Sequence, residues 1–129
     1  MRYYIIAGEA SGDLHGSNLM KGLYSEDPQA EIRFWGGDLM ESVWRSNASA
    51  SESAPDLTAQ ESGLVRHYKE GAVMGFVEVI AKAGRLMKNV SFCKKDISEW
   101  KPDVVILIDY PGFNFKIAEF AHKAGFKVF

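Results

Sequence analysis

The sequence has one cysteine, no long apolar run and no excess of either charge, and each shortage excludes a class of protein. Cys93 stands alone in 129 residues, so the chain has neither a disulfide framework nor a thiolate metal site. No stretch approaches the ~18 consecutive apolar residues of a membrane-spanning helix, and the first apolar run is too short for a signal peptide. Lysine and arginine (15) nearly balance aspartate and glutamate (17), so nucleic acid is not expected as a partner.

What the chain does contain is a regular alternation of strand and helix patterns. Strands are predicted at residues 2–7, 31–35, 64–68, 103–110 and 127–129, and helices at residues 12–24, 38–45, 75–100 and 114–125. The run DVVILIDY is typical of a central parallel strand that is covered on both faces. This alternation predicts an open parallel α/β sheet of Rossmann type. Because the sequence stops inside a predicted strand, we expect residues 1–129 to be part of a longer domain.

Residues 46–62 differ in kind from their surroundings. Their sequence, SNASASESAPDLTAQES, has no apolar period and is rich in serine and alanine. Such a composition predicts a mobile surface loop.

Two polar segments follow predicted strands at their carboxyl ends, where open parallel sheets bind ligands. The first, GEASGD (residues 8–13), matches neither the dinucleotide-binding glycine pattern nor the P-loop. Glu9 and Asp13 would repel a phosphate placed close to this turn, whereas carboxylates accept hydrogen bonds from sugar hydroxyls. The segment therefore favours a sugar ligand. The alternative is that Ser11 or Asp13 only caps the following helix.

The second segment, DYPGFN (residues 109–114), begins with the sharper candidate. Asp109 follows five apolar residues at the mouth of the sheet, so we expect it to be partly removed from water and suited to general-base chemistry. Pro111 should hold Tyr110 extended, and Gly112 permits a tight turn. The alternative is that Asp109 only accepts backbone hydrogen bonds within its own loop.

Apolar side chains at residues 73–77 precede a long helix that carries Lys82, Arg85 and Lys88 on its polar side. This pattern fits an element that lies on a membrane surface, and it also fits a helix with a core face and a solvated face. His15, in the first turn of a helix, either bonds a ligand or is simply exposed.

Four segments together resemble one family. They are AGEASGDLHG (residues 7–16), FWGGDLM (34–40), AVMGFVEV (72–79) and DYPGFN (109–114), and their order and spacing are similar to those of lipid-A-disaccharide synthase. The resemblance implies a GT-B glycosyltransferase, in which two Rossmann-like domains face a cleft. By that likeness, residues 1–129 are a partial N-terminal, acceptor-side domain, and the C-terminal UDP-donor domain is absent. The family has a short, glycine-containing link at about residues 41–63, so the segment at 46–62 is expected to be an insertion or a substituted segment.

The resemblance also implies a reaction. The family joins UDP-2,3-diacylglucosamine to 2,3-diacylglucosamine 1-phosphate and releases UDP and a β-1′,6-linked disaccharide. Asp109 would be the general base of this inverting transfer, and Asn114 would support its loop. The expected substrate-binding residues are Glu9, Ser11, Gly12, Asp13 and His15 beside the sugars, and Met74, Gly75, Phe76 and Glu78 beside the acyl chains or the acceptor. No metal or cofactor is implied, and the expected location is cytoplasmic, peripheral on the inner membrane.

Two other interpretations stay open. The chain by itself could be a binding module for acylated sugars or membrane, without activity, because the donor domain is absent. It could instead be a flavodoxin-like nucleotide-binding domain, although the acidic turn GEASGD argues against a bound nucleotide.

Overall fold

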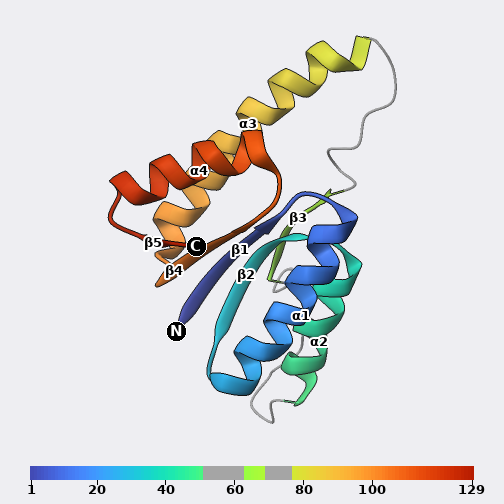
Figure 1. The fold of residues 1–129 in the computed structure, drawn as a ribbon, viewed down its shortest axis with the longest axis vertical. Helices are drawn as coiled ribbons and strands as arrows, with labels where there is room; N and C mark the ends of the chain where they lie inside the picture. Colours follow the sequence, from blue (N-terminus) through green and yellow to red (C-terminus); the bar gives the residue numbers. More distant parts are fainter. Residues whose placement is uncertain (51–62, 69–76) are drawn as a thin grey trace.

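The chain forms a five-stranded, all-parallel sheet in the order β3-β2-β1-β4-β5. The structure, a computed structural model, describes residues 1–50, 63–68 and 77–129 (Figure 1). Its elements are β1 (Arg2–Ala7), α1 (Ala10–Glu26), β2 (Glu31–Gly36), α2 (Asp38–Ala50), β3 (Leu64–His67), α3 (Val77–Trp100), β4 (Val104–Ile108), α4 (Pro111–Lys123) and β5 (Lys127–Val128). The predicted Rossmann-like sheet is confirmed.

Helices cover both faces of the sheet, α1 and α2 on one side and α3 and α4 on the other (Figure 1). Side chains of β1 alternate between two cores, as the period of two in a strand requires. Tyr3 and Ile5 pack with Met20 of α1, whereas Tyr4 and Ile6 pack with residues of α3 and α4. Because β1 is buried on both faces, its apolar residues run without interruption.

A partly buried polar network ties β1 and β2 to α3. Arg33 makes a bidentate ion pair with Asp96, with N–O distances of 2.6 and 2.7 Å. The Tyr4 hydroxyl donates to Asp96 at 2.7 Å and accepts from the Trp35 indole nitrogen at 2.8 Å. Each polar group placed in this network therefore has a partner, which offsets the cost of its burial.

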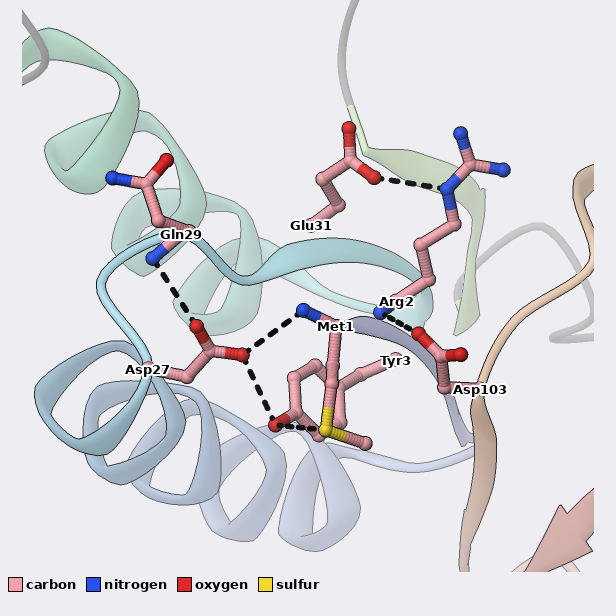
Figure 2. Close-up of polar contacts among 7 residues, drawn as sticks. All are labelled: Met1, Arg2, Tyr3, Asp27, Gln29, Glu31 and Asp103. Carbon is pink, nitrogen blue, oxygen red and sulfur yellow. Dashed lines mark hydrogen bonds and ion pairs between the residues drawn. The ribbon is translucent and has the colours of Figure 1, made fainter.

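The amino edge of the sheet is held by ionic and polar contacts (Figure 2). Asp103 accepts a 2.7 Å hydrogen bond from the backbone N–H of Arg2, and the Arg2 side chain pairs with Glu31 at 2.9 Å. Asp27 accepts bonds from the N-terminal amine at 3.1 Å and from the Tyr3 hydroxyl at 3.4 Å. These contacts stabilise the amino edge of the sheet. The candidate site lies at the opposite, carboxyl edge.

Several helix boundaries differ from the predicted ones. α1 begins at Ala10 instead of residue 12, and α2 continues to Ala50 instead of ending near residue 45. Residues 46–50 are thus helical, and the rest of the predicted loop, 51–62, lies outside the described residues. α4 begins at Pro111 instead of Asn114, because a proline suits the first helical turn, where its missing N–H has no partner to lose.

Candidate active site

The two polar segments predicted to bind ligand lie side by side at the carboxyl edge. β1 pairs with β4 in parallel, and Ala7 is opposite Ile108 at the end of the ladder. A Cβ atom on Gly8 would lie 2.3 Å from the ring of Tyr110, and one on Gly12 would lie 3.6 Å from the Ile108 side chain. At position 8 only a residue without a side chain allows this approach, so Gly8 brings the GEASGD turn against the DYPGFN segment.

Asp109 and Tyr110 both have left-handed backbone conformations, with φ of 50° and 65°. The expectation that Pro111 holds Tyr110 extended is therefore wrong. Tertiary contacts outweigh the local preference, because the Tyr110 ring stacks on Phe113 with centroids 4.8 Å apart and packs over Gly8. Non-glycine residues in this conformation cost energy and gather at functional sites, so the turn is a candidate by its backbone alone.

Asn114 holds this turn from inside α4. It is 6% exposed, and its side-chain amide donates to the carbonyl oxygen of Asp109. The backbone N–H of Asn114 also donates to the Tyr110 carbonyl at 2.8 Å. Asn114 thus contacts the loop that it was predicted to support, although it acts from within the helix and not as its N-cap.

Asp109 itself is exposed, which corrects the expectation that burial would remove it from water. Its position is set by the backbone of the turn. An exposed carboxylate on a fixed backbone can still meet a substrate hydroxyl.

In the first segment, Glu9, Ser11 and His15 are exposed around the start of α1, and Gly12 is buried against the sheet. Glu9 occupies the N-cap position but makes no side-chain capping bond. Among these residues, Glu9, Ser11 and His15 have the exposure that a contact with ligand needs.

Asp13 has a structural role that differs from both predictions. It is 3% exposed, and its carboxylate accepts backbone N–H bonds from Gly37, Leu39 and Met40 at 2.9–3.0 Å. These donors belong to the start of α2, whose positive dipole end favours a carboxylate. Asp13 therefore caps α2 and not its own helix, and a contact with sugar hydroxyls would require it to give up bonds of the fold.

Sequence reasoning missed a second group of residues at this edge, which follows β2 and β3. A small pocket, here called the edge pocket, lies beside the end of β1 and is lined by Trp35, Arg66, His67, Tyr68, Asn89 and Tyr110. His67 Nε2 is 2.9 Å from Asp38 Oδ1. The signal was available, because Arg66, His67 and Tyr68 close a predicted strand at the edge where ligands bind.

Four of the predicted substrate-binding residues cannot be placed in the candidate site. Met74, Gly75 and Phe76 lie outside the described residues, and of Glu78 the structure describes only its place in α3. None of the helices among residues 1–50, 63–68 and 77–129 has the length and apolar character to span a bilayer. In the same ranges, no three His, Cys, Asp or Glu side chains gather as metal ligands would.

Comparison with known proteins decides the family. The family model described as "Lipid-A-disaccharide synthetase" matches residues 3–129. The chain belongs to the lipid-A-disaccharide synthase family. A protein of that name from Geobacter metallireducens is 41% identical over 127 residues, which are 98% of this chain and 29% of that protein. The lipid-A-disaccharide synthase from Syntrophus aciditrophicus is 37% identical over 125 residues, which are 97% of this chain and 28% of that protein.

The chain thus spans less than a third of these relatives, and the match includes both carboxyl-edge segments. The family resemblance drawn from the four sequence segments is confirmed. The candidate site of this chain is best defined at three residues, Asp109, Tyr110 and Asn114. Their contacts hold the turn after β4, which pairs with β1.

Proposed function

We propose that this chain is the acceptor-side part of a glycosyltransferase of lipid A biosynthesis. The reaction is the transfer of 2,3-diacylglucosamine from its UDP conjugate to the 6-hydroxyl of 2,3-diacylglucosamine 1-phosphate. One observation carries the proposal for this chain: Asp109 stands exposed on a left-handed turn that Asn114 and Tyr110 hold against the first polar segment.

The proposed transfer requires one general base. As the acceptor 6-oxygen attacks the donor anomeric carbon, a new C–O bond forms, the bond to UDP breaks with its electron pair, and the configuration inverts. The carboxylate of Asp109 takes the proton of the attacking hydroxyl. General-base catalysis of this kind contributes typically about 10²–10⁴-fold in rate. From the neighbouring turn, the Glu9 carboxylate accepts hydrogen bonds from sugar hydroxyls, and the Ser11 hydroxyl can donate or accept them.

Binding can be tested with the 129-residue chain itself. We would titrate it with a short-chain 2,3-diacylglucosamine 1-phosphate and follow backbone amide NMR signals, with UDP as the control ligand. The proposal expects shifts at residues 8–16 and 109–114 and no response to UDP. A response to UDP alone would support the nucleotide-binding alternative.

Catalysis can be tested in a chimera in which this chain replaces the matching segment of the Geobacter metallireducens relative. Asp109→Asn should lower kcat by about 10²–10⁴-fold, because an amide cannot take the proton. Glu99→Gln, which removes an exposed carboxylate of α3, is the matched control and should leave kcat unchanged. Equal activity of the Asp109→Asn and parent chimeras would show that Asp109 is not the base.

We also propose a peripheral location on the cytoplasmic face of the inner membrane, since the substrates carry acyl chains. In α3, Arg85 and Lys88 are exposed, and Met87 between them is 55% exposed. Cations flanking an apolar side chain suit an anionic lipid surface. Co-sedimentation with vesicles that contain anionic lipid should occur and should weaken for Arg85→Gln with Lys88→Gln. Equal sedimentation with neutral vesicles would contradict it.

A further inference from the structure

A groove between α3 and α4 combines an apolar floor with a positively charged rim. The two helices lie on the same side of the sheet (Figure 1), and the space in the groove between them is about 320 Å³. Met87 and Val90 of α3 and Phe120 of α4 supply its apolar surface. The volume is at the lower end of the range of small-molecule sites. This α3–α4 groove is therefore large enough for a small ligand, and it shares no residue with the candidate active site.

The rim carries an excess of positive charge. Three of its residues are lysines, Lys94, Lys116 and Lys123, and one is a glutamate, Glu119. Lys123 Nζ lies 2.9 Å from Glu119 Oε1, and Lys94 Nζ lies 5.7 Å from the centre of the Phe120 ring. The hydrogen bond from Lys123 lowers the pKa of the Glu119 carboxyl, and the charges of the three lysines lower it further. The ammonium groups thus gather around one carboxylate, which balances only part of their charge.

Exposed apolar side chains accompany these cations. Met87 is 55% exposed at the groove, and Phe115 is 75% exposed one helical turn before Glu119. Residues four apart lie on the same face of a helix, so Phe115 stands beside the rim. A free phosphate or an acidic peptide would neutralise the lysines and leave Met87 and Phe115 in water. A lipid surface does both, because apolar side chains enter the layer just beneath its phosphate groups.

We propose that the α3–α4 groove binds the headgroup of an anionic phospholipid, with the phosphate on Lys94, Lys116 and Lys123. A lysine ammonium is a compact charge on a flexible stem, so it can follow a mobile headgroup without the fixed geometry of a guanidinium. The first carbons of the acyl chains then meet Met87 and Phe115. The inference rests on the proposed membrane location, because a bilayer supplies this ligand, and it adds the class of lipid and the place where it binds.

The test uses the 129-residue chain and lipids that stay monomeric in water. Dihexanoyl phosphatidylglycerol below its micelle concentration is the anionic probe, and dihexanoyl phosphatidylcholine has the same chains without net charge. Glycerol 3-phosphate supplies a phosphate without chains, and a short oligoglutamate represents an acidic peptide. Backbone amide NMR signals of residues 87–94 and 115–123 report binding.

The four probes separate the possible ligands of the groove. We expect saturable shifts with phosphatidylglycerol and none with phosphatidylcholine. Glycerol 3-phosphate should bind roughly tenfold more weakly than phosphatidylglycerol, the effect of about two buried CH₂ groups. Equal affinity for phosphatidylcholine would overturn the role of the lysines. Glycerol 3-phosphate or oligoglutamate binding as tightly as phosphatidylglycerol would assign the groove to a soluble anion and overturn the proposal.

Three variants at exposed positions test the assignment to the rim. Lys116→Gln should weaken phosphatidylglycerol binding by roughly fivefold, the effect of one surface cation on an anionic lipid. Glu119→Gln removes the competing carboxylate and should strengthen binding by a similar factor. Lys95→Gln is the matched control, because it removes the same charge from a residue of α3 that pairs with Glu99 and should bind like the parent. Equal effects of Lys116→Gln and Lys95→Gln would overturn the proposal.

The inference and the proposed function can fail separately. Co-sedimentation of the parent with anionic vesicles tests the membrane location by itself. Sedimentation without any binding of monomeric phosphatidylglycerol would remove the groove and keep the location. Binding of the monomeric lipid without sedimentation would keep the groove and remove the location. Asp109→Asn in the chimera tests transfer alone, and the same change in the 129-residue chain should leave lipid binding unchanged.

Discussion

The ring of Tyr110 occupies the space in which a Cβ atom on Gly8 would lie, 2.3 Å from the nearest ring carbon. This contact joins the turn after β1 to the turn after β4, and it places the left-handed Asp109–Tyr110 pair beside the start of α1. The shape of the candidate site therefore depends on the absence of one methyl group.

Gly8→Ala should force the Tyr110 ring to move and destabilise the chain by about 1–3 kcal/mol, the usual cost of overpacking. Gly22→Ala is the matched control, because a Cβ atom there meets nothing within 4 Å inside α1. It should be neutral or stabilising by up to about 1 kcal/mol, since alanine favours a helix. Urea denaturation measures both. Equal stabilities of the two variants would contradict the close contact.

Asp13→Asn should lower the free energy of unfolding by about 1.5–3 kcal/mol, because hydrogen bonds to a charged group carry about that much. The amide nitrogen would face a backbone N–H of α2 where a carboxylate oxygen now accepts it. Glu9→Gln changes an exposed carboxylate that makes no capping bond and should stay within about 0.5 kcal/mol of the parent. Parent-like unfolding of Asp13→Asn would show that the cap contributes little.

Stability should fall in alkaline solution partly through Cys93. Burial raises the pKa of its thiol to about 12, against about 8.5 in an unfolded chain. Because the folded pKa is the higher one, the contribution is complete below about pH 8.5 and is lost as the pH rises, since only the unfolded chain releases the proton. From pH 8.5 to 9.5 the parent should lose about 1 kcal/mol relative to Cys93→Ala. Urea denaturation at both pH values measures the two stabilities. Equal losses of stability in the parent and in Cys93→Ala would contradict the prediction.

Asn114→Asp should loosen the turn that carries Asp109. The variant keeps the shape of the side chain but replaces the amide nitrogen by an oxygen. In the parent that nitrogen donates to the carbonyl oxygen of Asp109, whereas the new oxygen would repel it. Amide hydrogen exchange at residues 109–113 should accelerate more than tenfold, as expected for a lost bond of about 1.5 kcal/mol. Asn18→Asp, an exposed change on α1, is the control and should leave exchange there unchanged.

Much of the fold could be predicted because it depends on patterns within short segments. The apolar run of β4 and the glycine and proline after it place a strand and a turn with no knowledge of neighbours. The prediction failed where packing decides the backbone, in part against the distant Gly8. Pro111 favours an extended Tyr110, but the stacking on Phe113 and the contact with Gly8 impose a left-handed backbone.

The candidate site divides in the same way. Asp109 and Asn114 were found because they closely follow a strand whose carboxyl end binds ligands in this fold. The edge pocket was not found, because its walls come from β2, β3, α3 and the turn after β4. Arg66, for example, lies over the ring of Phe92, which is far along the chain in another element.

The sequence by itself determined the alternation of strands and helices, the parallel sheet and the family, because apolar periodicity and short motifs are local properties of the chain. The tertiary structure alone decided that Asp13 caps α2, that Asp109 stays exposed on a left-handed turn, and that Arg66 and His67 meet Tyr110 around one pocket. The physical reason is that these outcomes are set by packing and hydrogen bonds between segments far apart in sequence, whose energies outweigh the local preferences of the residues involved.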